Sequence, residues 1–249
     1  MSESTGVITH HLISQAHPLE YQTAVVIPAF NEESSIGRVV DAIPRFAVSE
    51  IIVVNNGSSD STATVAREAG ATVLSEPRKG YGYACLQGIA HAIKNKADII
   101  AFMDGDNSDY PDDLPDILRP IQEDGYDMVV GSRILGKREP GAMLPQAIIG
   151  NWIACFLIRM FWGCTFTDLG PLRAVRADAL QKMQMSDPTF GWTVEMQIKA
   201  AKLKLKCTEV PVRYRKRIGN SKVTGTLSGT LQASMKILYT ILKHLFTKA

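Results

Sequence analysis

Two carboxylates follow an apolar segment near the middle of the chain. Ile99 to Met103 has the apolar character of a buried strand, and Asp104 and Asp106 come next, separated by Gly105. Side chains two residues apart in extended backbone point to the same side, and the glycine leaves room for a ligand. Carboxylate oxygens suit Mg²⁺ or Mn²⁺, which proteins often share with a substrate diphosphate. The pattern predicts a site for a divalent cation and a nucleotide diphosphate, with a solvated acidic turn as the alternative.

The elements that must position these carboxylates alternate between short apolar strands and helices. Strands are predicted at residues 23–28, 51–55, 71–74, 99–103 and 127–130, and helices at 34–43, 60–69, 82–94 and 111–123. This alternation predicts an α/β fold in which a mostly parallel sheet has helices on both faces. Ligands of such sheets bind beyond the carboxyl ends of the strands, where the polar loops 29–33, 55–60 and 104–109 would meet.

The second half of the chain is less regular and ends in a predicted amphipathic helix. Two further helices are predicted at 145–161 and 194–201, and a strand at 207–214. The last helix, at 231–246, carries a stripe of apolar side chains: Leu231, Met235, Leu238, Leu242 and Leu245. Such a stripe packs in a core, in a seam between subunits or at a membrane surface, and the pattern leaves these three open.

Charge is distributed unevenly, although the net charge of the 249 residues is only +2. From Met196 to the end there are twelve Lys and Arg against one acid, whereas residues 98–127 hold ten acids against one base. The basic arm favours phosphates or an anionic membrane, with a solvated surface as the alternative, and the acidic stretch favours a cation.

Targeting signals and cysteine usage bear on the location of the protein. No secretory signal is recognised, and the apolar stretch 147–162 is interrupted by Asn151 and Arg159, so no spanning helix is expected. The four cysteines form no Cys-x-x-Cys pair, which predicts a reducing, cytoplasmic compartment.

Several segments, taken together, resemble the motifs of glycosyltransferase family 2. They are residues 25–33, 52–62, 78–84, 103–115, 131–133, 167–174, 191–195 and 212–222. The subgroup that they resemble most is the polyprenyl-phosphate sugar synthases, such as dolichyl-phosphate mannose synthase. The resemblance implies a GT-A type fold with a Rossmann-like nucleotide half and an acceptor half, and inversion at the anomeric carbon.

On the donor side, the resemblance implies a set of residues that contact the nucleotide and its phosphates: Pro28, Ala29, Asn31, Glu32, Asn56, Lys79, Asp104, Gly105, Asp106, Arg213, Arg215 and Lys222. Asp104 and Asp106 would hold Mg²⁺ or Mn²⁺. Asn55 and Asn56 stand where the family often has paired acids, so the base stays open, and Asn56 either contacts the base or forms the turn.

Two basic segments would meet the phosphates. The glycines at positions 80 and 82 would let a diphosphate approach the start of a helix beside Lys79. Strand alternation would place Arg213, Arg215 and Arg217 on one face, which suits several phosphate contacts.

On the acceptor side, the resemblance implies that Arg133 lies near the acceptor and that Asp168 is a base or an orienting group. The alternative for Asp168 is a cap of the following turn. Members of the subgroup commonly carry a further arginine just before the helix that holds Asn151, where this chain has Gln146 and residues 147–149 instead. This departure weakens the case for a lipid-phosphate acceptor.

We therefore expect a metal-dependent transferase that moves a hexose from a UDP- or GDP-linked donor to a polyprenyl phosphate at the cytoplasmic membrane face. The main alternative acceptor is a hydroxyl of a lipid or small molecule, for which Asp168 would serve as general base. A sugar-nucleotide pyrophosphorylase and a non-catalytic binding module rank below both. The expected organisation is a tail at 1–20, a catalytic domain at 21–225 and a helix at 226–249. The expected partners are donor, lipid acceptor and membrane surface but no nucleic acid, and a homo-oligomer stays open.

Overall fold

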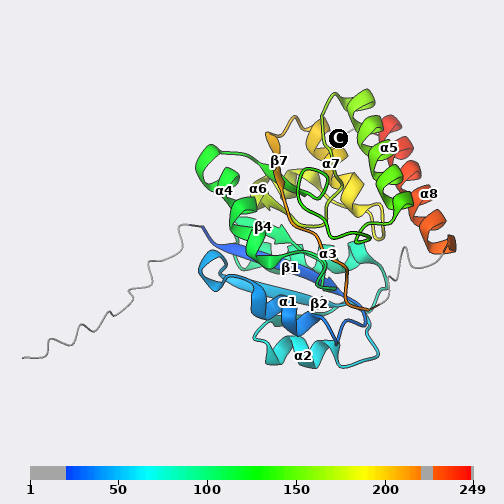
Figure 1. Cartoon of the computed structure of the whole chain (residues 1–249). Helices are drawn as coiled ribbons and strands as arrows, with labels where there is room; N and C mark the ends of the chain where they lie inside the picture. Colours follow the sequence, from blue (N-terminus) through cyan, green and yellow to red (C-terminus); the bar gives the residue numbers. More distant parts are fainter. Residues whose placement is uncertain (1–20, 220–226, 248–249) are drawn as a thin grey trace, which may run out of the picture.

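The computed structural model describes residues 21–219 and 227–247, which form a sheet with helices on both faces (Figure 1). The strands are β1 (Thr23–Ala29), β2 (Glu50–Asn55), β3 (Thr72–Ser75), β4 (Ile99–Phe102), β5 (Met128–Ser132), β6 (Arg173–Arg176) and β7 (Cys207–Pro211). The α-helices are α1 (Ile36–Ala42), α2 (Thr62–Glu68), α3 (Tyr81–Lys94), α4 (Leu114–Asp124), α5 (Pro145–Trp162), α6 (Ala177–Met183), α7 (Trp192–Lys202) and α8 (Leu227–Phe246). Two short 3-10 helices, η1 (Arg45–Ala47) and η2 (Pro111–Asp113), precede β2 and α4.

The strands form a seven-stranded sheet in the order β3-β2-β1-β4-β6-β5-β7. β6 runs antiparallel to β4 and β5, and every other neighbouring pair is parallel. The predicted mostly parallel sheet is confirmed, whereas β6 and α6 were not predicted from the sequence. β6 lacks an apolar run because Arg173 and Arg176 stand at its two ends.

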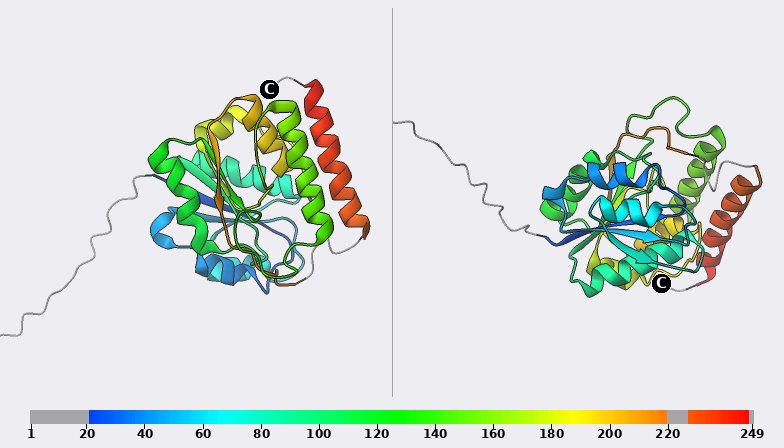
Figure 2. Two further views of the ribbon diagram at one scale, coloured as in Figure 1. Left: turned by 45° about the horizontal axis from the view of Figure 1, so that its top comes forward. Right: turned by 90° about the horizontal axis from the view of Figure 1, so that it is seen from below.

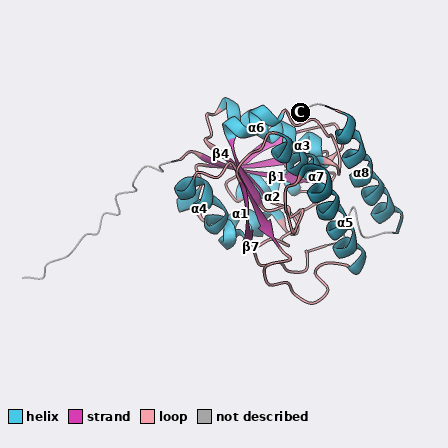
Figure 3. Ribbon diagram, turned by 90° about the horizontal axis from the view of Figure 1, so that it is seen from above, coloured by secondary structure: helices cyan, strands magenta, loops and turns pink. Residues whose placement is uncertain are grey.

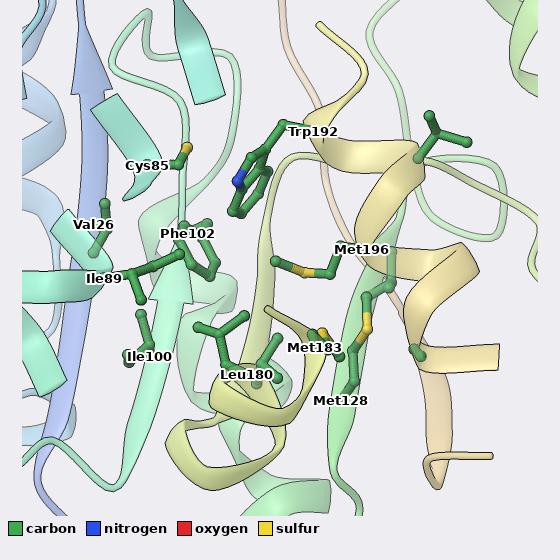
Figure 4. Close-up of a cluster of buried hydrophobic side chains, with 14 of the residues drawn as sticks. Val26, Cys85, Ile89, Ile100, Phe102, Met128, Leu180, Met183, Trp192 and Met196 are labelled. Atoms are coloured by element: carbon green, nitrogen blue, oxygen red, sulfur yellow. The ribbon is translucent and has the colours of Figure 1, made fainter. Parts of the chain in front are cut away.

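Alternate side chains of the strands enter two separate cores. Val25 and Ile27 of β1 join one core with α1, α2 and α4, whereas Val26 joins the other with α3, α5, α6, α7 and α8. Figure 4 shows part of this second core, in which the rings of Phe102 and Trp192 meet edge to face with their centroids 4.8 Å apart. The apolar character of the strands follows from burial on both faces.

The helices α5, α7 and α8 pack together beside the sheet, and α5 and α8 lie side by side in both views of Figure 2 and in Figure 3. The stripe predicted on α8 does not pack in a core of this chain, because Met235, Leu238 and Leu242 are 62%, 42% and 54% exposed. Thr240, Ile241 and His244 are buried instead. The side chain of Leu231 lies outside the described residues. Among the described helices, none combines the length and apolar character needed to cross a membrane.

Candidate active site

A pocket of about 290 Å³ opens at the carboxyl ends of β1, β2 and β4, where the sheet topology predicts a ligand site. It is lined by Pro28, Ala29, Phe30, Glu32, Asn56, Lys79, Gly80, Tyr81, Ala84, Asp104, Gly105, Asp106, Phe190 and Arg217. Eight of the predicted donor residues are therefore brought together: Pro28, Ala29, Glu32, Asn56, Lys79, Asp104, Gly105 and Asp106.

Asp104 and Asp106 face this pocket from the loop after β4. The Tyr81 hydroxyl donates to Asp104 Oδ1 at 3.2 Å, and the Ser108 amide donates to Asp106 Oδ1 at 2.9 Å. Burial, together with the nearby charge of Asp106, raises the pKa of Asp104 to about 7. Two neighbouring carboxylates in a partly buried pocket repel each other, and this repulsion favours the binding of a counter-cation.

Arg217 supplies positive charge to these carboxylates in the structure. Its Nη2 lies 3.2 Å from Asp106 Oδ2 and 3.3 Å from Glu32 Oε1, and its buried Nε has no hydrogen-bond partner. Of the three arginines expected on one face, only Arg217 lines the pocket. This arginine was not among the predicted site residues, although the alternation argument included it.

The donor set fits a divalent cation shared with a diphosphate. Asp104 and Asp106 offer hard carboxylate oxygens, and the guanidinium of Arg217 shows that a cation is accommodated at Asp106 Oδ2. No cluster of three or more His, Cys, Asp or Glu with ligand geometry exists among the described residues. Two protein carboxylates leave further coordination positions to phosphate and water, as Mg²⁺ and Mn²⁺ allow.

Asn56 holds the loop that follows β3. Its Nδ2 donates to the carbonyls of Glu76 and Arg78 at 3.0 and 2.7 Å, and its Oδ1 accepts from the Gly80 amide at 2.8 Å. The amide thus holds the 76–80 loop, and because Asn56 also lines the pocket, its contact with the base stays a prediction. Asn31, at φ +53°, lies outside the pocket and accepts from the Ser59 amide at 2.8 Å. Both residues position neighbouring loops.

The glycines at the start of α3 are required by the close approach of another protein segment. A Cβ on Gly80 would lie 2.3 Å from the Pro188 carbonyl oxygen, and one on Gly82 would lie 1.9 Å from that of Asp187. The Tyr83 amide donates to the Pro188 carbonyl at 3.1 Å. Gly80 also lines the pocket, so the expectation that the diphosphate approaches the start of α3 stays a prediction. Lys79 still lines the pocket, 5.5 Å from the Phe30 ring centroid.

Asp168 and Arg133 form an ion pair outside the pocket lining, in which the Asp168 side chain is fully buried and the Arg133 side chain stays 14% exposed. Asp168 is fully buried and accepts from Arg133 Nε at 2.8 Å, Nη2 at 2.7 Å and the Arg133 amide at 2.8 Å. Although burial opposes the charged guanidinium, the Asp168 carboxylate raises the pKa of Arg133 above its usual value. Both carboxylate oxygens are occupied, so the geometry supports orientation of Arg133 rather than proton removal.

The segment around Asp168 is fixed from several sides. Asn151 on α5 donates to the Thr167 carbonyl at 2.9 Å and accepts from the Leu169 amide at 2.8 Å. Glu209 accepts from the amides of Thr167 and Asp168, and Gln197 donates to the Asp168 carbonyl at 2.9 Å. The Arg133 guanidinium also stacks over the Tyr214 ring at 5.0 Å.

The other predicted basic residues are engaged elsewhere. Arg213 pairs with Asp113, with Nη2 2.6 Å from Oδ1, while Arg215 donates to the carbonyl and the side chain of Asn107. Both guanidinium groups stack over Tyr110. The one-face expectation is wrong because β7 ends at Pro211, before these arginines. Lys222 lies outside the described residues.

Two lining residues, Tyr81 and Phe190, were not predicted as site residues, although Tyr81 lies within the segment 78–84. Tyr81 touches Asp104 and packs against Trp192, with ring centroids 6.0 Å apart. Phe190 reaches the pocket from the loop before α7. Periodicity marks neither of them, since each depends on the 186–191 loop folding back over the start of α3.

The fold, with a pocket of paired carboxylates at this sheet edge, defines a glycosyltransferase of the GT-A type. The chain belongs to glycosyltransferase family 2: the family model Glycosyl transferase family 2 matches residues 24–183. The chain is therefore a glycosyltransferase.

Known proteins similar to this chain include two bacterial relatives and a solved structure. An uncharacterized glycosyltransferase of Mycobacterium tuberculosis is 35% identical over 84% of this chain and 93% of its own length. An undecaprenyl-phosphate mannosyltransferase of Micrococcus luteus is 30% identical over 82% and 88%. The crystal structure of glucosyl-3-phosphoglycerate synthase from Mycobacterium tuberculosis with Mn²⁺, UDP and phosphoglyceric acid has a TM-score of 0.73. It is 23% identical and covers 92% of this chain and 80% of that chain, a likeness that shows the fold.

Proposed function

We propose that this protein transfers a hexose, with inversion, from a UDP- or GDP-linked donor to a polyprenyl phosphate at the cytoplasmic face of a membrane, with Mg²⁺ or Mn²⁺. The observation that carries the proposal is the pocket in which Asp104, Asp106 and Arg217 converge beside Glu32 and Lys79. The undecaprenyl-phosphate mannosyltransferase relative supports the acceptor class.

In the donor half, Lys79 and Arg217 are the positive groups that would meet the diphosphate, and Asp104 and Asp106 are the residues that would hold the cation. A bound divalent cation supplies counter-charge to the diphosphate as it leaves. Tyr81 orients Asp104 through the hydroxyl contact, and Ser108 orients Asp106. These contacts fix both carboxylates before the donor arrives, which lowers the cost of ordering the site.

In the acceptor half, Arg133 is the group that meets the incoming nucleophile, and Asp168 keeps it in place. An acceptor phosphate oxygen forms the bond to the anomeric carbon as the bond to the diphosphate breaks. A phosphate is already anionic at neutral pH, so no proton needs to be removed. A hydroxyl acceptor requires a free general base, and Asp168 is fully buried with both oxygens bound to Arg133.

The second candidate is the same transfer onto a hydroxyl. One observation favours it: the segment before Asn151 offers Gln146 and no arginine for an acceptor phosphate. The two candidates share the donor chemistry and differ only in the nucleophile.

The test pairs a short polyprenyl phosphate with the matching polyprenol, using UDP- and GDP-hexoses with Mn²⁺ or with a chelator. We expect product only with the phosphate, inverted at the anomeric carbon by NMR, and none with the chelator. Product from the alcohol alone, together with a greater loss in Asp168→Asn than in Arg133→Gln, would support the hydroxyl acceptor instead. Formation of nucleotide sugar from hexose phosphate would exclude both.

A further inference from the structure

Exposed apolar side chains gather on α5 and α8. Eleven of the fifteen large apolar side chains exposed in the described residues belong to these two helices. On α5, Trp152, Phe156 and Met160 are 65%, 51% and 55% exposed, and Trp152 stacks on Phe156 with centroids 5.7 Å apart. On α8, the most exposed are Phe246, Met235 and Tyr239, followed by Leu242. Contiguous apolar surface of this kind marks an interaction site.

These side chains form one face across two neighbouring helices. They recur at spacings of three and four on each helix, as positions on one helical stripe do. The opposite stripes are buried, with Asn151 and Ile158 on α5 and Thr240 and Ile241 on α8. Because α5 and α8 pack side by side (Figure 3), their outward stripes adjoin. We call this surface, formed by the outward stripes of α5 and α8, the α5–α8 face.

The charges on this face distinguish a lipid surface from a second copy of the chain. Neither α5 nor α8 contains an Asp or Glu, and the exposed cations Arg159 and Lys243 lie on the same stripes as Phe156 and Phe246. In a twofold contact through this face, the cations of one copy would lie close to the cations of the other copy. Neither helix offers an acid to pair them. Anionic headgroups would pair both, and Trp and Tyr side chains suit the boundary between headgroups and acyl chains.

We propose that the α5–α8 face docks the protein on an anionic lipid surface and that α5 thereby fixes the acceptor side of the site to that surface. Asn151, on the inner side of α5, bonds the residues on both sides of Asp168, and Asp168 holds Arg133. A docked bilayer thus lies about one helix diameter, roughly 10 Å, from this pair. The inference rests on the proposed function with a lipid-phosphate acceptor. It adds the face of the protein that contacts the membrane in which this acceptor lies.

The test is sedimentation of the full chain with vesicles of phosphatidylcholine, with and without phosphatidylglycerol. We expect binding to the mixed vesicles that weakens with added salt. Trp152→Ser with Phe156→Ser, and separately Leu242→Ser with Phe246→Ser, should each weaken it about tenfold or more. The matched control is Phe46→Ser on η1, which removes a side chain that is 75% exposed and should leave binding unchanged.

Two further measurements test whether the α5–α8 face itself contacts the lipid. Trp152 emission should shift to the blue on vesicles, and Trp152→Phe should remove most of that shift while binding persists, since Trp192 is already buried and Trp162 is partly buried against the core. Arg159→Glu with Lys243→Glu should abolish the preference for anionic vesicles. Because all these side chains are exposed, the variants should fold, which circular dichroism checks.

Several outcomes would overturn the inference. Absent vesicle binding, or equal binding by wild type and both double variants, would remove the face as a docking site. A dimer that the same double variants convert to monomers, without vesicle binding, would assign the face to a second copy. Transfer to a short, water-soluble polyprenyl phosphate tests the proposed function separately, because it requires no bilayer. Its failure would remove the lipid-phosphate acceptor without deciding the vesicle result.

Discussion

At the scale of single residues, the ligands that the pocket can bind depend on which positive group pairs with Asp106. Its Oδ1 is held by Ser108 and its Oδ2 by Arg217, so the carboxylate is fixed in orientation while one oxygen faces the pocket. A divalent cation and a guanidinium are thus alternatives at the same oxygen.

Replacement of this carboxylate should separate folding from turnover. Asp106→Asn keeps the side-chain volume and the Ser108 contact but loses the charge, so we expect a folded protein whose turnover falls about a hundredfold or more. Sugar transfer at saturating Mn²⁺ and Mn²⁺ binding by electron paramagnetic resonance measure the effect. Asp116→Asn, an exposed carboxylate on α4, is the control and should change neither. Near-normal turnover in folded Asp106→Asn would exclude Asp106 as a metal ligand.

Arg217 should weaken the binding of Mn²⁺ and strengthen the binding of UDP. Without a donor its guanidinium lies at Asp106 Oδ2, and with a donor the diphosphate offers it a better-charged partner. In Arg217→Gln we expect Mn²⁺ to bind about tenfold more tightly without UDP, and UDP to bind about tenfold more weakly with Mn²⁺. Calorimetric titration measures both, with the exposed Lys216→Gln as control. A loss of Mn²⁺ affinity in the absence of UDP would contradict this role.

Site residues that directly follow a strand can be predicted from the sequence. Site residues whose positions depend on contacts between distant segments cannot. Asp104 and Asp106 follow a buried strand, so their place at the sheet edge is set locally. Asn56 was ambiguous because its partners, the backbone groups of Glu76, Arg78 and Gly80, lie more than one element away. Phe190 carries no local signal at all.

At the scale of elements, β6 is the part of the sheet that the sequence could not predict. Arg173 is fully buried inside the fold, where its guanidinium donates to the carbonyls of Leu169, Gly170 and Thr193. Burial lowers the pKa of Arg173 to about 10. A charged residue in a central strand departs from the apolar pattern by which strands are predicted. The backbone carbonyls that accept its hydrogen bonds come together only in the folded chain.

The helix α8 reaches the donor pocket through the loop 186–191. Lys236 Nζ lies 2.8 Å from Asp187 Oδ2, and the neighbouring Pro188 carbonyl accepts from the Tyr83 amide at the start of α3. The same loop carries Phe190 into the pocket wall. Hydrogen bonds from the Ser186 and Asp187 amides to Glu195 anchor it to α7.

Removal of the Lys236 charge should therefore loosen the pocket wall at a distance. In Lys236→Met, Asp187 loses its cation in a buried position, so we expect faster hydrogen exchange in 184–191 and a severalfold higher KM for the donor. Vesicle binding should be retained, because the methionine keeps the apolar stem. Lys182→Met, an exposed lysine on α6, is the control. An unchanged KM with unchanged exchange would show that α8 and the pocket are independent.

At the scale of the whole molecule, the two cores correspond to two tasks. The core with α1, α2 and α4 supports the loops that hold Glu32, Asp104 and Asp106, while the core with α3, α5 and α7 supports Asp168 and the loop 186–191. The continuous apolar run of β1 predicts from the sequence that both faces of the sheet are covered, and so predicts both cores. The outward face of α5 could not be predicted, since its apolar composition is equally typical of a fully buried helix.

A protein that docks through one face and takes its acceptor from the same surface should respond to surface concentration. When the bulk concentrations of protein and polyprenyl phosphate are fixed and inert anionic lipid is added, the acceptor becomes dilute within the bilayer. We expect the initial rate to fall in proportion to the mole fraction of acceptor once all the protein is bound. A protein that meets its acceptor from solution would show a rate set by bulk concentration alone.

The α5 double variant supplies the contrast for this measurement. With Trp152→Ser and Phe156→Ser the docking face is weakened, so the rate on vesicles should fall, whereas the rate with a short, water-soluble polyprenyl phosphate should match that of wild type. Phe46→Ser should behave as wild type in both assays, because its exposed ring lies on η1. Equal losses of the double variant in both assays would place Trp152 and Phe156 in the structure of the acceptor site itself, since Asn151 beside them holds the Asp168 segment.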